Sequence, residues 1–143
     1  MSELALERGR PKKVLELGSG SGYQTAILAS LADEICSIER IKPLMERAKI
    51  KLRSLRIHNS RLRHADGFAG WASEAPFDLI LSAAASQKIP QAWLQQLKPG
   101  GQLILPVGLE RQKLVRVTAE AEGFVEECIE DVHFVPLVSG LIR

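Results

Sequence analysis

The stretch Val14-Leu15-Glu16-Leu17-Gly18-Ser19-Gly20-Ser21-Gly22 sets the fold class of this chain. A short apolar run enters a loop with a glycine at every second position, and a helical pattern follows. This is the setting of a nucleotide-binding turn, because glycine tolerates positive φ and lets a ligand approach the backbone. The dinucleotide fingerprint would need glycine where Tyr23 stands, and the Gly-Lys-Ser/Thr ending of a P-loop is absent.

Short apolar runs alternate with helical patterns along the rest of the chain. We expect parallel strands at residues 14–17, 34–38, 60–65, 77–81 and 102–107, and helices at 21–31, 41–55 and 91–97. Two further strands, 114–118 and 124–134, flank a tight turn at Glu122-Gly123. The order predicts an α/β fold with a doubly wound, mostly parallel sheet and C-terminal antiparallel edge strands. We expect one domain over residues 1–143.

Two details of this prediction concern packing. The strand at 77–81 is apolar on both faces, which favours a central place in the sheet. The helix at 21–31 is expected to bury one stripe of side chains, formed by Tyr23, Ala26, Ile27, Ser30 and Leu31.

Composition excludes several classes of protein. The chain has 143 residues, of which 45% are hydrophobic and 25% are charged, as in an ordinary globular domain. Cys36 and Cys128 form no CxxC or CxxH pattern, so we expect no metal site, a reducing compartment and two buried thiols. Neither a signal peptide nor an apolar run of about 20 residues is present, which indicates a cytoplasmic protein with no membrane partner.

Charge is unevenly distributed, although the net charge is only +2. The segment from Arg40 to Arg63 contains nine basic residues and one acidic residue, Glu46, whereas the C-terminal part is acidic. We interpret the basic segment as the solvated face of a surface helix. An RNA-binding face is the alternative.

Candidate ligand residues follow successive strands, where parallel sheets bind their ligands. Glu39 is placed to accept hydrogen bonds from ribose hydroxyls, and Asp66-Gly67 to read the edge of an adenine. A loop without a phosphate-binding lysine suits an adenosine ligand that carries no phosphates, such as S-adenosylmethionine. The cofactor-binding candidates are Glu16 (toward the methionine end), Gly18, Ser19, Gly20, Gly22, Glu39, Arg40, Asp66 and Gly67.

Residues 14–26 resemble motif I of the protein-L-isoaspartate O-methyltransferases. The resemblance continues through residues 37–40, 64–67, 75–78, 97–101, 105–108 and 134–138. It implies a class I, Rossmann-like methyltransferase that moves a methyl group from S-adenosylmethionine to the free carboxylate of isoaspartyl residues in damaged proteins, a repair reaction. That carboxylate is ionised at neutral pH and needs no general base, so His58, His64 and His133 are interpreted as structural or surface residues.

The resemblance also implies where the acceptor binds. Isoaspartyl proteins or peptides are expected to lie across the loop after the fourth strand and the 135–137 segment, with Ala84, Ala85, Val135, Pro136 and Leu137 as substrate-binding residues. Nucleic acid is disfavoured as a partner.

Two departures from the family pattern concern activity. Family members carry a longer segment before motif I, with a hydroxyl that orients the acceptor; here Ser2-Glu3-Leu4-Ala5-Leu6 matches only the end of its helix. Residues 83–90 also lack the family's Ala-Ala-Pro, which leaves Ser86 as a weak catalytic candidate. We therefore expect a more open cofactor site, self-association through uncovered apolar surface, and catalytic competence that needs separate proof.

Three other functions are compared with protein repair. A non-catalytic S-adenosylmethionine-binding or interaction module would keep the cofactor and lack turnover. An RNA methyltransferase would use the basic helix, and residues 135–137 argue against it. A nicotinamide dehydrogenase is the least favoured, because of Tyr23.

Overall fold

A computed structural model describes residues 9–143 of the chain. Its strands are β1 (Lys13–Leu17), β2 (Glu34–Glu39), β3 (Ser60–His64), β4 (Phe77–Ser82), β5 (Leu97–Val107), β6 (Gln112–Glu120) and β7 (Gly123–Val132). The helices are α2 (Tyr23–Leu31), α3 (Lys42–Ser54) and α4 (Gln91–Gln95), with 3-10 turns η1 (Gly67–Ala69) and η2 (Ala72–Glu74). The match predicted for Ser2–Leu6 lies outside the described residues.

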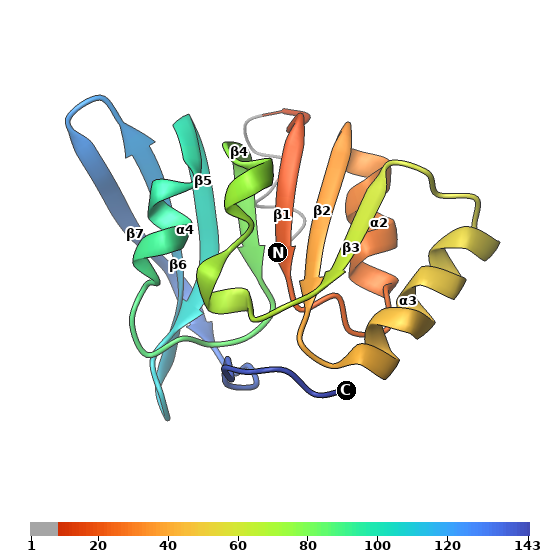
Figure 1. Ribbon diagram of the computed structural model, residues 1–143. Coiled ribbons are helices and arrows are strands. Elements are labelled where there is room, and N and C mark those ends of the chain that lie inside the picture. The colour runs from red at the N-terminus through yellow and green to blue at the C-terminus, as the bar shows by residue number, and fades with distance from the viewer. Residues whose placement is uncertain (1–8) are drawn as a thin grey trace.

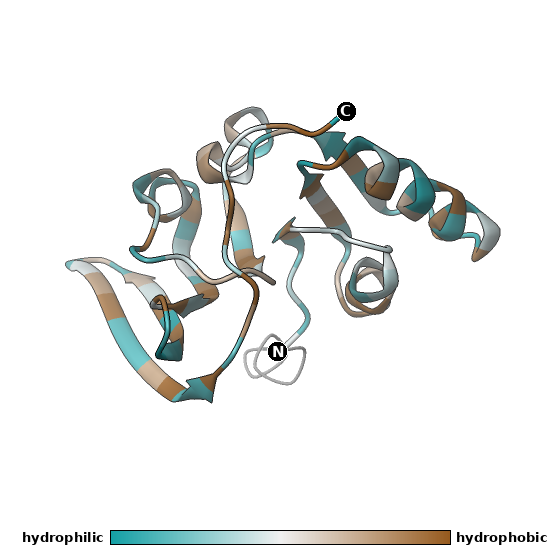
Figure 2. Cartoon of the chain, turned by 90° about the horizontal axis from the view of Figure 1, so that it is seen from below, coloured by the Kyte–Doolittle hydropathy of each residue, from teal (hydrophilic) through white to brown (hydrophobic). Residues whose placement is uncertain are grey.

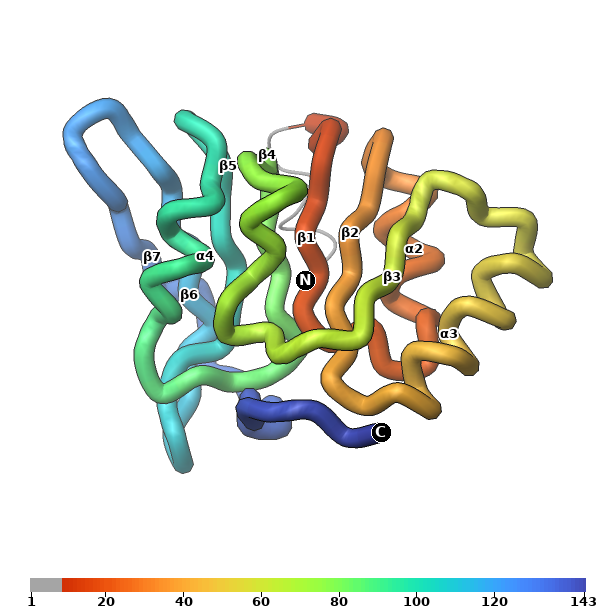
Figure 3. Tube along the Cα trace, in the orientation of Figure 1, coloured from red at the N-terminus to blue at the C-terminus, as the bar shows by residue number. Residues whose placement is uncertain are grey.

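All seven strands form one sheet in the order β3-β2-β1-β4-β5-β6-β7. The first five are parallel, and β6 and β7 are antiparallel additions (Figure 1). This confirms the doubly wound α/β fold and its antiparallel edge, and β4 takes the central place predicted for it. The crossings that keep the strands parallel bring their carboxyl ends to one side, the lower edge in Figures 1 and 3.

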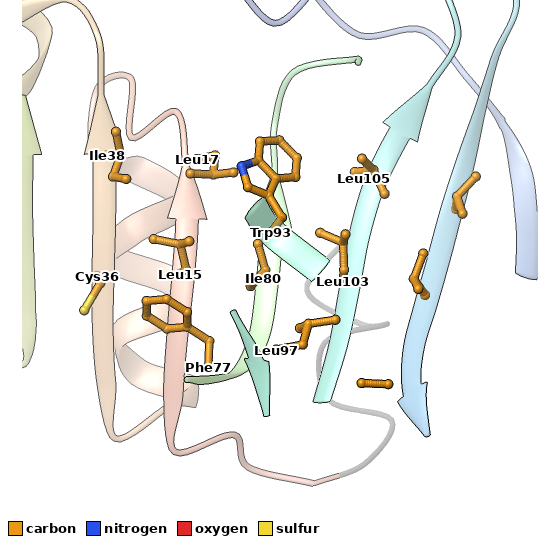
Figure 4. Packing of buried hydrophobic residues seen from close by; sticks show 13 residues of the cluster. Leu15, Leu17, Cys36, Ile38, Phe77, Ile80, Trp93, Leu97, Leu103 and Leu105 are labelled. Carbon is orange, nitrogen blue, oxygen red and sulfur yellow. The ribbon is translucent and has the colours of Figure 1, made fainter. Parts of the chain in front are cut away.

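Each face of the sheet carries its own apolar core. On one face, Trp93 of α4 is fully buried beside Leu17, Ile80 and Leu103 (Figure 4). On the other face, Leu28 of α2 belongs to a second buried cluster, which includes the strand residues Val14, Ile35, Leu79, Leu81, Ile104 and Leu114. The Trp93 indole N–H donates to the Gly67 carbonyl at 2.8 Å, so α4 also fixes the loop that follows β3.

The stripe predicted for the first helix is wrong. α2 buries Thr25, Leu28 and Ala29, while Tyr23 is 67% exposed and Ile27 is 36% exposed. Small and apolar residues of α2 occur on all sides of the helix, so the periodicity of its sequence defines the buried face poorly. A polar contact decides the orientation instead, because the Thr25 hydroxyl donates to the buried carboxylate of Glu16.

The helix predicted over residues 91–97 is too long at its end. α4 stops at Gln95, and Leu97 already pairs with Phe77 as the first residue of β5. The strand register shifts between Phe77 and Leu79, and this irregularity accommodates the Pro99-Gly100-Gly101 segment inside the strand.

The prediction for the two cysteines is half right. Both thiols are free; Cys36 is buried in β2, but Cys128 is exposed on β7. Among the described strands β7 pairs only with β6, so its side chains lie at an open margin of the sheet. None of the described helices has the length and apolar character needed to cross a membrane.

Candidate functional site

A cleft of about 510 Å³ lies at the carboxyl ends of the central strands. Four segments meet there. They are the glycine loop (residues 18–22), the junction between β2 and α3, the loop after β4 (residues 83–90, called the β4 loop) and residues 135–138, which we call the wall. The lining comprises Leu17, Gly18, Gly20, Ile38, Glu39, Arg40, Ile41, Leu44, Gly67, Ala83, Ala84, Val135, Pro136, Leu137 and Val138. It thus brings together five predicted cofactor residues and four predicted substrate residues.

The glycine loop leaves room for a ligand where side chains would otherwise stand. Gly18 and Gly20 have φ values of +93° and +52°. A Cβ on Gly20 would meet none of the described atoms within 4 Å, and a Cβ on Gly18 would meet only Ala83 Cβ, at 4.0 Å. Both glycines line the cleft and neither Cβ position is occupied, so the loop forms a cradle whose backbone a ligand can approach.

Gly22 has a different position, outside the lining. It caps the N-terminus of α2 in the left-handed region, with φ +87°. A Cβ here would lie 3.1 Å from Ala48 Cβ, because α3 packs closely against this turn. The close packing of α3 against this turn therefore explains why a glycine stands at position 22.

Glu39 connects the glycine loop with the start of α3. Its carboxylate accepts hydrogen bonds from the Gly20 N–H at 2.8 Å and from the Ile41 N–H at 3.0 Å. The side chain is 6% exposed and lines the cleft at the end of β2. It therefore fixes the glycine loop relative to the start of α3 and presents a carboxylate to the cavity.

Glu16 lies beneath the loop and is fully buried. Its Oε1 accepts hydrogen bonds from the hydroxyls of Thr25 and Ser37, the latter at 2.7 Å. Burial raises the pKa of Glu16 to about 7 against the lowering effect of these two hydroxyls, and the nearby charge of Glu39 adds to the rise. Glu16 Oε2 and Ser19 Oγ are buried polar atoms without a hydrogen-bond partner in the described part of the chain.

Asp66 is adjacent to the cleft but turned away from its lining. Its Oδ1 accepts from Phe68 N at 2.9 Å, and its Oδ2 accepts from Gly140 N at 3.0 Å. The next residue, Gly67, does line the cleft. The predicted adenine-reading carboxylate is therefore bonded to the C-terminal segment in this structure.

The wall is held in place by the β4 loop. Ala85 N donates to Val135 O at 2.7 Å, and Leu137 N donates to Ala85 O at 2.6 Å. This parallel bridge carries Val135, Pro136 and Leu137 across the carboxyl ends of the strands, where Figure 2 shows the chain crossing.

A second cleft of about 690 Å³ lies on the other side of the wall and shares Pro136 and Leu137 with the first. Ala85 and Ser86 line this second cleft. The Ser86 hydroxyl donates to Lys88 O, while its N–H donates to Pro106 O at 3.0 Å. The structure therefore places Ser86 outside the first cleft, with its hydroxyl engaged by the backbone.

Glu34, Cys36 and Glu74 bring three potential metal-ligand atoms together on the sheet. Lys13 Nζ lies 3.0 Å from Glu74, and Arg61 lies 3.1 Å from Glu34 through Nη2 and pairs with Glu74 through Nη1. Burial raises the pKa of the Cys36 thiol to about 11. Two cationic side chains thus already neutralise this acidic group.

Sequence reasoning missed several residues at the site. Ile41 and Leu44 line the cleft, although they were predicted only as part of the helix over residues 41–55. Thr25 and Ser37 hold Glu16, and the only sequence signal for them is a hydroxyl residue within an otherwise apolar helix or strand. His64 fits its structural interpretation, because Nε2 lies 2.9 Å from Arg40 O and 3.0 Å from Ile142 O.

Comparison with known proteins agrees with this geometry. The family model for protein-L-isoaspartate(D-aspartate) O-methyltransferase matches residues 1–141. The protein-L-isoaspartate O-methyltransferases of Shewanella loihica and Colwellia psychrerythraea are 53% and 51% identical over 140 residues, which is 98% of this chain. The chain spans about two thirds of their own length, 66% and 65% respectively.

Solved structures share the fold. A protein-L-isoaspartate O-methyltransferase superposes with a TM-score of 0.85 at 26% identity, covering 93% of this chain and 44% of that one. A Plasmodium falciparum chain assigned to the same enzymes, solved with S-adenosyl-L-homocysteine, gives 0.76 at 24% identity, with coverage of 89% and 66%. The family model, which matches nearly the whole chain, shows that the chain belongs to the protein-L-isoaspartate(D-aspartate) O-methyltransferase family.

Proposed function

We propose that this chain binds S-adenosylmethionine in the first cleft and transfers its methyl group to the free carboxylate of isoaspartyl residues in damaged proteins. The observation that carries the proposal is the composition of one cleft. The glycine cradle, the Glu39 carboxylate and Gly67 meet there with the β4 loop and the wall. Membership of the isoaspartyl methyltransferase family supports the same reading.

The residues present fit the cofactor. The open Cβ positions of Gly18 and Gly20 leave space for a ligand against the backbone, and Glu39 offers a carboxylate to ribose hydroxyls. Ser19 Oγ and Glu16 Oε2 are buried polar atoms with unused hydrogen-bonding capacity at the start of the loop, and we assign them to the methionine end. Arg40 and Gly67, which both line the cleft, would lie beside the adenine.

The chain's part in the chemistry is alignment and exclusion of water. When bound, S-adenosylmethionine supplies a methyl group activated by its sulfonium charge. Leu17, Ile38, Ile41 and Leu44 make the cleft largely apolar, which keeps water from the reacting centre. The acceptor carboxylate is already ionised near neutral pH, so the residues of the cleft need only hold it in line.

We place the acceptor peptide along the wall. Ala84, Val135, Pro136 and Leu137 face the first cleft, and Ala85 faces the second. A peptide lying over Pro136 and Leu137 would have one cleft on each side. Its isoaspartyl carboxylate would enter the first cleft, and its flanking residues would occupy the second cleft. Both cysteines are free, which supports a cytoplasmic, reducing setting for this repair activity.

The test combines binding and turnover in one sample. S-adenosyl-L-homocysteine is titrated into the chain by calorimetry, and methyl transfer is then followed with an isoaspartyl peptide and its normal aspartyl counterpart. The proposal predicts saturable binding and methylation of the isoaspartyl peptide alone. Gly20→Val should abolish both, because its side chain would occupy the cradle. Binding without turnover would instead support the non-catalytic cofactor-binding module.

A further inference from the structure

The last residues of the chain cross one end of the first cleft. We call residues 139–143 the strap. Gly140 N donates to Asp66 Oδ2 at 3.0 Å, and Ile142 N donates to Arg40 O at 2.8 Å. Lys42 N donates in return to Ile142 O at 2.7 Å, which completes a parallel bridge between the strap and the start of α3. In Figure 2 the chain runs from β7 across the sheet edge to this point.

Backbone hydrogen bonds, rather than buried side chains, hold the strap. Leu141 and Ile142 are each 46% exposed, and Ser139 and Gly140 are exposed as well. The additional polar contact comes from His64, whose Nε2 lies 3.0 Å from Ile142 O. A segment with few buried apolar contacts opens at low free-energy cost, so the strap can open while the sheet stays folded.

The strap passes one end of the cleft without lining it. Val138, the residue before it, lines the cavity, as do Arg40 and Ile41 at its far anchor and Gly67 beside Asp66. Residues 139–143 are not among the described residues that line the cavity, and about 510 Å³ remains with the strap in place. The strap therefore spans the end between Gly67 and Ile41, where the proposed function places the adenosine.

We propose that the strap is a clasp that retains the adenosine part of the cofactor, with Gly140, Ile142 and His64 as positioning residues. The inference rests on the proposed function. Cofactor enters and leaves when the Gly140–Asp66 and Ile142–Arg40 bonds open, and the closed strap slows its release. Because the ligand passes the strap on entry and on exit, weakening the strap speeds both dissociation and association.

Two substitutions weaken the strap, and each has a matched control. Gly140→Ala opposes the +89° φ of Gly140, and Gly123→Ala imposes the same kind of strain at +139° in the distant β6–β7 turn, neither Cβ meeting a described atom within 4 Å. His64→Ala removes the contacts of Nε2 with Ile142 O and Arg40 O, and His58→Ala removes an exposed histidine from another part of the chain.

The experiment measures the dissociation rate of S-adenosyl-L-homocysteine by rapid dilution of the loaded chain. Gly140→Ala and His64→Ala should each raise this rate about threefold or more, while both controls match the parent. In a chain lacking residues 140–143 the rate should be highest, and His64→Ala should then add nothing. That loss of effect separates a role through the strap from a general structural role of His64.

Two results would overturn the clasp. Unchanged dissociation in the strap variants would show that the strap does not retain the ligand. Tighter binding on weakening the strap would show that it blocks the cleft instead. If the parent chain bound no S-adenosyl-L-homocysteine, the proposed function would fail and the clasp with it; binding by the parent with unaltered strap variants rejects the clasp alone.

Discussion

At the scale of single residues, Glu39 combines two tasks. It accepts the N–H groups of Gly20 and Ile41, and it presents a carboxylate to the cleft. Glu39→Ala should lower the affinity for S-adenosyl-L-homocysteine about tenfold or more, because charge-assisted hydrogen bonds worth about 1.5–3 kcal/mol are lost. Calorimetry measures the change, with Glu46→Ala on the exposed side of α3 as the control for lost charge. An unaltered dissociation constant in Glu39→Ala would remove the ribose assignment.

Glu16 predicts a pH dependence of stability. Its pKa rises from an ordinary 4.5 to about 7 on burial, so between these values the folded chain binds more protons than the unfolded chain. The free energy of unfolding therefore falls as pH rises through this window, by up to about 3 kcal/mol. Glu16→Gln should lose this part of the slope and exceed the parent in stability at pH 8.

Denaturant unfolding at pH 5 and pH 8 measures this difference. Glu46→Gln, which alters an exposed acid, should keep the parent's slope. Parallel pH profiles for the parent and Glu16→Gln would contradict a proton held at Glu16.

The two thiols should differ in reactivity. Cys36 is buried and its pKa is raised to about 11, whereas Cys128 is exposed on β7. Because the thiolate is the reactive form, the native chain at pH 7.5 should react rapidly at Cys128 alone. A chromogenic disulfide reagent should label one thiol in the native chain and both in denaturant. Rapid labelling of Cys36 in the native chain would show that β2 is less protected than the structure indicates.

The surroundings of a residue could be predicted where its place at the end of a strand determines them. Glu39 is the last residue of β2, at the carboxyl edge of the sheet, so its place beside the glycine loop could be predicted from the sequence. Asp66 also follows a strand, but its bond to Gly140 joins residues 74 positions apart, and no local pattern reports it. Thr25 and Ser37 were missed because their burial depends on a carboxylate contributed by a third element.

At the scale of elements, the irregular start of β5 depends on two glycines that differ in the space around them. A Cβ on Gly101 would lie 2.8 Å from Lys98 O and 2.9 Å from Phe77 O, where neither backbone oxygen can easily move. Gly100 has φ +82° with none of the described atoms within 4 Å of an added Cβ. Gly101→Ala should cost about 3 kcal/mol of unfolding free energy, and Gly100→Ala about 1 kcal/mol. Denaturant unfolding measures both, and equal losses would contradict the steric account of the strand irregularity.

Elements were predictable wherever periodicity was strong. The succession of strands and helices along the chain and the approximate length of α3 followed from alternating patterns, and α3 buries Met45, Ala48 and Leu52 at helical spacing. The face of α2 and the end of α4 did not follow, because a buried hydrogen bond fixes one and strand pairing with Phe77 fixes the other. Both are tertiary contacts that override local preference.

At the scale of the whole molecule, the cleft is a product of topology. The glycine loop, Glu39, Gly67, the β4 loop and the wall are far apart in sequence, and the parallel sheet collects their strand ends at one edge. The sequence predicted this edge as the ligand site. It could not predict the strap, because the conformation of that segment depends on backbone pairing with Arg40 and Lys42, which lie far away in the sequence.

The most direct test of the account is calorimetric titration of S-adenosyl-L-homocysteine into the chain, followed in the same sample by methyl transfer from S-adenosylmethionine to an isoaspartyl peptide. We predict saturable binding that Gly20→Val abolishes, together with methylation of the isoaspartyl peptide and not of its aspartyl counterpart. Absence of binding by the parent chain would contradict the assignment of the first cleft, and binding without methyl transfer would contradict the repair activity.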